Sequence, residues 1–294
     1  MQTRASIPLL AAAIAFAQQR PAGYPPEMPG SVTEVYKTAS GADLKLYIYN
    51  PPGHSAKSRS AAMVFFFFGG WTNGTPKQFE NQCKHLASRG MVCMSADYRV
   101  ASRHKVKAVE CVRDAKSAIR YVRRNAARLG IDPKRVAAGG GSAGGHLAAA
   151  AGTVAAFDEP GEDSRVSSRP DAMVLFNPAL VLAAIPGRET GKSIDLSERA
   201  GVDPKEISPY HQASKGAPPA IVFHGQADTT VPYVTAELFA EKMKSLGSRC
   251  DLEGYEGKAH GFFNYGRDGN EAYESTVKKM DAFLVSLKFL KSAK

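Results

Sequence analysis

The segment with the clearest chemical potential is residues 139–146, which read Gly-Gly-Gly-Ser-Ala-Gly-Gly-His. It contains the pattern G-x-S-x-G with Ser142 at its centre, between an apolar run that predicts a strand and a stretch with helical periodicity. Flanking glycines allow a sharp strand-to-helix turn that exposes the serine hydroxyl, and the helix directs its first N–H groups toward developing negative charge. The pattern alone is common, and a glycine-rich turn that only packs a helix against a strand is the alternative. In this context we predict that Ser142 is a nucleophile and that His146, one turn into the helix, is structural.

A nucleophilic serine needs a base, and the base needs an acid that orients it. Asp228 follows the apolar run 220–224, and His260 lies in the loop after the strand-like run 251–255. Each residue alone is weak evidence, because a loop aspartate is usually solvated and a loop histidine commonly has no special role. Both nevertheless lie just past the carboxyl ends of predicted strands, as Ser142 does, and open parallel sheets carry their active sites at that edge. The chain order serine, aspartate, histidine therefore predicts a catalytic triad.

The loop after an apolar strand near residue 65 is the expected source of donors for a tetrahedral oxyanion. Residues 65–71 read Phe-Phe-Phe-Phe-Gly-Gly-Trp, so a hydrophobic strand runs into a pair of glycines. Glycines let the backbone approach a substrate closely, and each oxyanion donor contributes roughly a hundred- to a thousandfold in rate. We therefore predict an oxyanion hole formed by the N–H groups of Gly69, Gly70 and Ala143. Trp71 is predicted to shape the substrate pocket.

The elements that must position these residues alternate between short apolar runs and longer helical stretches. Strands are predicted at residues 33–37, 44–49, 62–68, 91–96, 136–138, 172–176, 220–224 and 251–255. Helices are predicted at residues 76–88, 106–129, 143–155, 231–246 and 270–290. The first two strands read as an antiparallel pair, and a glycine follows three of the helices (Gly90, Gly130, Gly247), as a left-handed C-terminal cap requires. This alternation predicts an α/β fold in which helices cover both faces of a mostly parallel sheet.

The first residues read as an export signal rather than as part of the fold. A positive charge at Arg4 precedes an apolar run at 7–16, and Ala15-Phe16-Ala17 forms a small-x-small site ahead of Gln18. A buried N-terminal helix is the alternative. We predict a signal peptide at 1–17, an extended lead-in at 18–30, and a single domain at 31–294 with a short insertion at about 179–217. The mature protein is then expected to be secreted or periplasmic, without a membrane anchor.

Composition excludes several classes of protein. The chain has 294 residues, of which 44% are apolar and 22% charged, which suits a globular fold and not collagen, coiled coil or disorder. The net charge is +10, but Lys and Arg are scattered, so no nucleic-acid partner is predicted. The sequence has no CxxC pair, so no metal site is predicted. Disulfide pairing among the four cysteines (Cys83, Cys93, Cys111, Cys250) is left open, since four cysteines allow three connectivities.

Taken together, these residues resemble the α/β-hydrolase esterases related to hormone-sensitive lipase, especially their small bacterial acetyl- and feruloyl-esterase-like members. The matching motifs are residues 66–71, 97–99, 114–115, 139–147, 224–228 and 260–263. The resemblance implies an α/β-hydrolase fold with an eight-stranded sheet, and carboxylester hydrolysis without a cofactor. One departure is that Phe67 and Phe68 occupy the positions of the His and first Gly in the family's oxyanion loop. The hydrogen bonds that anchor this loop must therefore differ. Asp97, Tyr98, Arg99 and Asp114 are expected to form a structural polar network.

The sequence thus predicts a secreted serine carboxylesterase that hydrolyses short-chain acyl or carbohydrate-linked esters through an acyl-enzyme. The expected partner is a small-molecule or polysaccharide ester, and the oligomeric state is left open. A serine peptidase of the prolyl-oligopeptidase kind is one alternative, because it uses the same triad order. A non-catalytic binding module on the hydrolase fold is the other.

Overall fold

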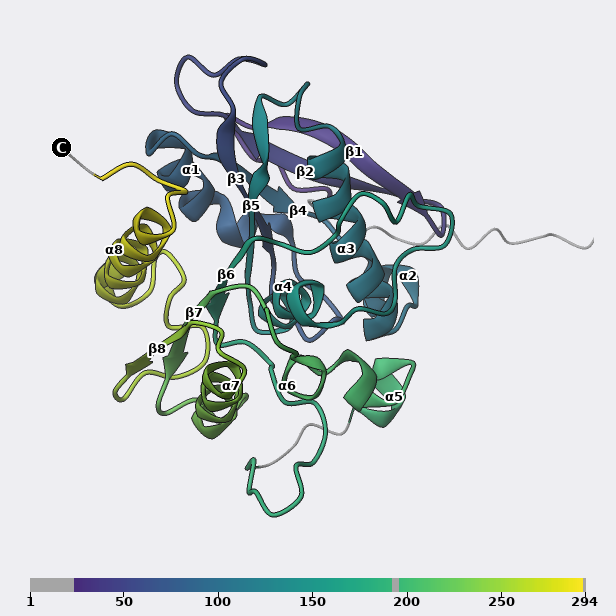
Figure 1. The fold of residues 1–294 in the computed structure, drawn as a ribbon, viewed down its shortest axis with the longest axis vertical. Helices are drawn as coiled ribbons and strands as arrows, with labels where there is room; N and C mark the ends of the chain where they lie inside the picture. Colours follow the sequence, from purple (N-terminus) through teal and green to yellow (C-terminus); the bar gives the residue numbers. More distant parts are fainter. Residues whose placement is uncertain (1–23, 192–195, 293–294) are drawn as a thin grey trace, which may run out of the picture.

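The structure is a computed structural model, and it describes residues 24–191 and 196–292. Within this range, eight strands form one sheet (Figure 1). They are β1 Val32–Ala39, β2 Ala42–Tyr49, β3 Ser60–Phe66, β4 Val92–Ala96, β5 Ile131–Gly141, β6 Ala172–Phe176, β7 Ala220–Gly225 and β8 Cys250–Tyr255. Their spatial order is β1-β2-β4-β3-β5-β6-β7-β8, with β2 antiparallel to β1 and β4 and all other neighbours parallel. This confirms the predicted α/β fold with a mostly parallel eight-stranded sheet.

Helices cover both faces of the sheet (Figure 1). They are η1 Pro76–Phe79, α1 Glu80–Ser88, α2 Ala101–His104, α3 Ala108–Arg124, α4 Ala143–Thr153, α5 Ser197–Ala200, η2 Pro204–Ile207, α6 Pro209–Gln212, α7 Tyr233–Ser245, η3 Asp268–Asn270 and α8 Glu271–Ser286. Side chains alternate along β3, so Val64 and Phe66 join one buried cluster with α3, α4 and α7, while Met63 and Phe65 join another with α1 and α8. A strand buried on both faces explains why this segment reads as a continuous apolar run.

The glycines predicted to end helices adopt the expected left-handed conformation. Gly90 has φ 93°, and the bonds from its N–H to Ala87 and from the Met91 N–H to Leu86 close a Schellman cap on α1. Gly247 (φ 74°) ends α7 with the same pair of bonds. These caps fix where each helix turns back toward the sheet.

The strand that leads into the predicted oxyanion loop ends earlier than the sequence indicates. β3 ends at Phe66, because the backbone groups of the next two residues form hydrogen bonds with side chains instead of with a neighbouring strand. The C=O of Phe67 accepts from the Tyr98 hydroxyl at 2.9 Å, and the N–H of Phe68 donates to Gln78 Oε1 at 2.7 Å. The loop therefore begins at Phe67, and the Phe68 ring is exposed.

The predicted insertion contains short helical turns rather than only irregular chain. α5, η2 and α6 lie between β6 and β7, and α6 contacts both α4 and α7. The predicted signal peptide at 1–17 falls outside the described residues. The four cysteines are free thiols, and two of them, Cys83 on α1 and Cys93 on β4, are hydrogen-bonded to each other in the core.

Candidate active site

Ser142 stands on a strained turn between β5 and α4. Its backbone has φ 52° and ψ −115°, a region that side-chain-bearing residues rarely adopt. A Cβ on Gly140 would collide with the carbonyl oxygen of Gly144, and a Cβ on Gly144 would collide with that of Phe66. The two glycines of the G-x-S-x-G pattern are therefore required by close backbone contacts inside the turn and against β3. The Ser142 N–H donates to Phe176 at the end of β6 at 2.9 Å, which ties the turn to the neighbouring strand.

Asp228 lies in the turn after β7 and is held by four hydrogen bonds. Oδ1 accepts from the N–H groups of Thr230 at 2.8 Å and Val231 at 2.9 Å. Oδ2 accepts from the Asn177 amide nitrogen and from His260 Nδ1, both at 2.7 Å. The donors leave this buried carboxylate oriented toward the imidazole.

A second histidine lies beside the same carboxylate. His224 is fully buried at the end of β7, and its Nε2 is 2.8 Å from the carbonyl oxygen of Val231 and 3.4 Å from Asp228 Oδ2. Burial raises the pKa of Asp228, but the hydrogen bonds from His224, His260 and the Val231 N–H outweigh it and hold the pKa well below its usual range. Asp228 is therefore ionised throughout the range in which an esterase would work.

The His260 loop packs against the other two segments. Gly225 lets the acid turn approach closely, because a Cβ there would collide with the carbonyl oxygen of Lys258. Phe263, three residues after His260, lies against the residue before the nucleophile: a Cβ on Gly141 would be 2.8 Å from its ring. The three segments predicted from the sequence thus meet at the carboxyl edge of the sheet.

The structure shows one of the two hydrogen bonds that a triad needs. Among the described residues, His260 bonds only to Asp228, and no hydrogen bond joins its imidazole to the Ser142 hydroxyl. The imidazole is 24% exposed, so its Nε2 is reachable from the site. Catalytic hydrogen bonds often tighten only when substrate is bound.

The loop predicted to form the oxyanion hole carries free donors. Gly69 (φ 123°) and Gly70 (φ 61°) are both left-handed, and the Gly69 carbonyl accepts from the N–H groups of Thr72 and Asn73. Within the described part of the chain, the N–H groups of Gly69, Gly70 and Ala143 donate to no protein acceptor. Unpaired N–H groups beside a helix N-terminus are what a developing oxyanion requires.

Trp71 lies in a different environment from the one we expected. Its side chain is only 3% exposed, so little of it can reach a substrate. The indole N–H donates to His146 Nδ1 at 3.1 Å, and His146 Nε2 is 2.8 Å from the carbonyl oxygen of Ile207. The neutral Nε2–H tautomer satisfies both contacts, and burial lowers the pKa of His146 to about 4. Trp71 therefore anchors the loop to α4 and the insertion, and His146 is structural, as predicted.

The residues expected to form a structural polar network do so. Arg99 donates to Asp114 through Nε and Nη2, each at 2.8 Å, and Lys37 Nζ lies 2.7 Å from the same carboxylate. Asp97 accepts from the hydroxyl of Tyr24 and the N–H of Tyr98, and burial raises its pKa to about 6. None of these groups lies in the triad.

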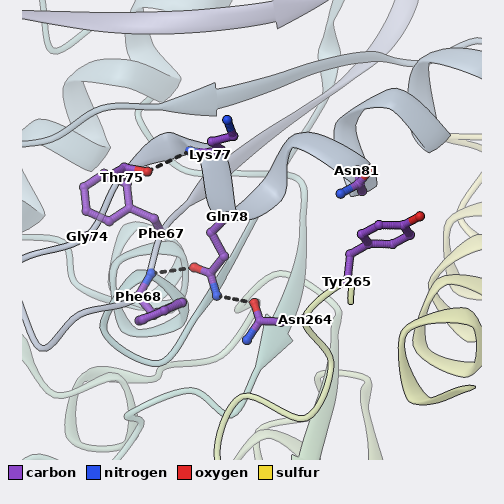
Figure 2. A pocket seen from close by; sticks show the side chains of 9 residues that line it. All are labelled: Phe67, Phe68, Gly74, Thr75, Lys77, Gln78, Asn81, Asn264 and Tyr265. Atoms are coloured by element: carbon purple, nitrogen blue, oxygen red, sulfur yellow. Dashed lines mark hydrogen bonds between the residues drawn. The ribbon is translucent and has the colours of Figure 1, made fainter. Parts of the chain in front are cut away.

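A pocket of about 380 Å³ opens beside the oxyanion loop (Figure 2). The residues around it come from that loop, from η1 and α1, and from the segment after His260. They are Phe67, Phe68, Gly74, Thr75, Lys77, Gln78, Asn81, Asn264 and Tyr265. Phe68 and Tyr265 are among the few exposed large apolar side chains of the described residues, and both border this pocket.

Three residues of the site escaped the sequence prediction. Asn177 and His224 contact Asp228, and Gln78 contacts the oxyanion loop. The available signal for Asn177 was its position directly after the predicted strand 172–176, at the same sheet edge. Over residues 24–191 and 196–292, no cluster of three or more His, Cys, Asp or Glu side chains could hold a metal ion, and no helix is long and apolar enough to cross a membrane.

Comparison with known proteins places the chain in a family of hydrolases. Residues 46–243 match the BD-FAE family and residues 198–293 match the dienelactone hydrolase family, so the chain belongs to the BD-FAE family of α/β-hydrolases. It is 52% identical to Thermogutta terrifontis esterase 2 in a form phosphonylated by sarin, with a TM-score of 0.90 over 92% of this chain and 99% of that one. The propionate-bound form of that esterase gives 53% identity and a TM-score of 0.88 over the same shares.

A curated relative is more distant. Esterase LipC of Mycobacterium tuberculosis is 32% identical over 221 residues, which is 68% of this chain and 52% of LipC. This chain thus spans about half the length of LipC. The match over 92% of this chain and 99% of the Thermogutta esterase confirms the predicted carboxylic ester hydrolase.

Proposed function

We propose that the chain is a secreted serine carboxylesterase that works through a Ser-His-Asp triad and an acyl-enzyme. The observation that carries the proposal is the 2.7 Å hydrogen bond between His260 Nδ1 and Asp228 Oδ2. This bond fixes the imidazole and leaves Nε2 without a partner among the described residues, at the sheet edge where Ser142 stands on its strained turn. An imidazole fixed by a carboxylate and free to accept a serine proton is the arrangement that activates a hydroxyl nucleophile.

In the proposed mechanism, His260 Nε2 accepts the proton of the Ser142 hydroxyl while the oxygen attacks the ester carbonyl carbon. Asp228 stays ionised and stabilises the imidazolium that forms. The bond from the carbonyl carbon to the alcohol oxygen then breaks, and the alcohol leaves with the proton from His260. Water attacks the acyl-enzyme by the same route, which releases the acid and restores Ser142.

The oxyanion would be stabilised by the three unpaired backbone donors. The N–H groups of Gly69 and Gly70 come from the loop after β3, and that of Ala143 from the first turn of α4. Phe67 and Phe68 replace the His-Gly pair of the family's oxyanion loop, but the three donors are unaffected by this replacement. Each donor contributes roughly a hundred- to a thousandfold to the rate.

The pocket beside the loop supports short-chain acyl or carbohydrate-linked esters as substrates. Its volume of about 380 Å³ suits a small group. The exposed rings of Phe68 and Tyr265 offer apolar faces for a sugar or aryl ring, and the amides of Asn81 and Asn264 offer polar partners for hydroxyls. The propionate and butyrate complexes of the Thermogutta esterase favour short acyl chains.

Replacing Ser142 with Ala tests the nucleophile. We expect turnover of p-nitrophenyl acetate to fall at least about a thousandfold, because no other hydroxyl occupies the turn. A fluorophosphonate probe is expected to label the wild type and not the variant, which also tests the non-catalytic alternative. The matched control is Ser245→Ala, an exposed serine on α7 that bonds only its own helix, and it should turn over at the wild-type rate. Turnover or labelling retained by Ser142→Ala would refute the assignment.

The substrate class is tested by a series of p-nitrophenyl esters of increasing acyl length, run beside acetylated xylan, methyl ferulate and a peptide p-nitroanilide. The highest kcat/KM is expected for acetyl to butyryl esters, with a fall for longer chains that the pocket cannot hold. Cleavage of the peptide amide at a comparable kcat/KM would instead favour the serine peptidase.

A further inference from the structure

Gln78 occupies a junction between segments that are far apart in the sequence. It lies on η1, the single 3₁₀ turn before α1, and its side chain extends between Phe68 and Asn264 along the pocket (Figure 2). Gln78 Oε1 accepts from the N–H of Phe68 in the oxyanion loop at 2.7 Å, and Nε2 donates to Asn264 Oδ1 at 2.9 Å. One amide group therefore joins the oxyanion loop to the segment after His260.

The contacts of this amide continue to the reacting groups. Asn264 Nδ2 donates to the carbonyl oxygen of Gly261 at 2.8 Å, and Gly261 is the residue after His260. A Cβ on Gly141, the residue before Ser142, would lie 3.3 Å from Gln78 Nε2. Gln78 thus contacts, directly or through Asn264, the backbone beside the oxyanion donors and the base, and it lies close to the residue before the nucleophile.

The oxyanion loop needs such a support because Phe67 occupies the position of the histidine with which this loop usually begins in the family. In this chain Phe67 is held by the Tyr98 hydroxyl and by stacking of the two rings, with centroids 4.1 Å apart. The next N–H, that of Phe68, has Gln78 as its partner. The carbonyl of Gly69 is held from the other side by Thr72 and Asn73, so the bond to Gln78 closes the set of contacts around the first oxyanion donor.

We propose that Gln78 is a positioning residue, which holds the oxyanion loop and the His260 loop in the relative geometry that catalysis requires. The inference rests on the proposed function, since it assigns Gln78 a role in the same site. The Phe68 N–H donates to Gln78 and therefore cannot serve as an oxyanion donor. The oxyanion donors are the next N–H groups, those of Gly69 and Gly70. A displacement of about 1 Å in such a site lowers the rate by roughly a hundredfold.

The test replaces Gln78 with Leu, which keeps the approximate volume and removes both hydrogen bonds. We expect kcat for p-nitrophenyl acetate to fall 10- to 100-fold while KM changes less than about threefold, because the loss falls on the transition state. The affinity for a trifluoromethyl ketone, which forms a tetrahedral adduct with the serine, is expected to fall by the same factor as kcat/KM. Gln78→Glu retains the acceptor for the Phe68 N–H but loses the donor to Asn264 Oδ1, so it is expected to recover part of kcat and to stay below the wild type.

Controls separate this role from a merely structural one. Gln212→Leu makes the same chemical change at a half-buried glutamine of α6 that bonds only Lys205, and should leave kcat and ketone affinity unchanged. Asn264→Ala removes only the link to the His260 loop and is expected to lower kcat less than Gln78→Leu does, which keeps the inference testable if Gln78→Leu does not fold.

Two results would overturn the inference: an unchanged kcat in Gln78→Leu, or a reduced kcat without a matching loss of ketone affinity. Either result, with wild-type turnover intact and Ser142→Ala inactive, would leave the proposed function standing. Turnover by Ser142→Ala would instead refute the proposed function itself.

Discussion

The carboxylate of Asp228 shows how much a single residue depends on donors from other parts of the chain. Two of its bonds come from its own turn, but the amide of Asn177 comes from the end of β6 and the imidazole of His260 from the loop after β8. Hydrogen bonds to a charged group contribute about 1.5–3 kcal/mol each. Asn177 is therefore a partner of the triad acid whose loss should affect the proposed reaction.

Replacing Asn177 with Gly tests this contact while keeping the left-handed backbone, which has φ 42°. We expect kcat to fall about tenfold with KM nearly unchanged, because Asp228 loses a donor that fixes its orientation. Asn270→Gly is the matched control, since Asn270 is also left-handed (φ 70°) but lies at the start of α8 and caps only Gly266. A kcat within twofold of the wild type in Asn177→Gly would contradict the role.

The residue types of the proposed triad could be predicted from the sequence, but their partners could not. Ser142, Asp228 and His260 each follow a predicted strand, so their position at the sheet edge follows from the alternation of strands and helices. Asn177 and Gln78 act through contacts with segments 51 and 186 residues away. The sequence around Asn177 or Gln78 does not indicate which distant segment will pack against it.

At the scale of the elements, the errors of the sequence prediction have local physical causes. β5 spans Ile131–Gly141, whereas the sequence indicates only residues 136–138. Its first half carries charged residues around a proline, and its last three residues are glycines, and both features are disfavoured in strands. The close approach of β3 requires the first two of these glycines, because a Cβ on Gly139 or on Gly140 would lie 2.6 Å from an atom of Phe65 or Phe66, respectively.

The helix predicted at 106–129 illustrates the opposite error. α3 ends at Arg124, and the chain then forms a turn in which Asn125 Nδ2 donates to the carbonyl oxygen of Tyr121 at 2.9 Å. Asparagine competes for backbone groups in this way and so ends helices before the periodicity does. Gly130 (φ 63°) closes the turn rather than the helix.

The contact between Trp71, His146 and Ile207 joins three elements and predicts how stability depends on pH. His146 has a pKa of about 4 in the folded protein and 6.5 as the ordinary value. Between these pH values the imidazole is protonated in the unfolded chain but not in the folded protein. The contribution of His146 to the free energy of unfolding therefore falls by about 3 kcal/mol as the pH drops from 6.5 toward 4. Asp97 acts in the opposite direction, because its raised pKa of about 6 favours the folded state at low pH.

Comparison of the wild type with His146→Gln isolates the contribution of His146 to the pH dependence of stability. The variant no longer carries a proton-binding group at 146, while Asp97 contributes equally to both proteins. We expect the difference in free energy of unfolding between wild type and variant, measured by urea denaturation, to fall by about 3 kcal/mol from pH 7 to pH 4. His54→Gln is the control for the His-to-Gln change itself, since His54 is a half-buried histidine whose Nε2 lies 2.8 Å from the carbonyl oxygen of Leu129, just before β5. Parallel pH dependence in wild type and His146→Gln would contradict the assignment.

At the scale of the whole molecule, the sheet order explains why one edge gathers the site. β5, β6, β7 and β8 are consecutive parallel neighbours, so the turns that follow them lie side by side. The sequence predicts this edge, because it depends only on strand order and direction. The pocket depends instead on how η1 and the chain after His260 meet across the oxyanion loop, which is a matter of side-chain packing (Figure 2).

Residues 1–17 are expected to direct export of the whole molecule. Arg4, the apolar run at 7–16 and the small residues Ala15 and Ala17 meet the requirements for a cleaved signal. Expressed from Met1 in a Gram-negative host, the protein is expected in the periplasm with Gln18 as its N-terminal residue, as read by mass spectrometry. Ala17→Phe places a bulky side chain at the cleavage site and should block processing, whereas Gln19→Ala, just beyond the site, should be processed normally. A wild-type chain that retains residues 1–17 in the cytosolic fraction would show that this segment is no signal, and the esterase would then act inside the cell.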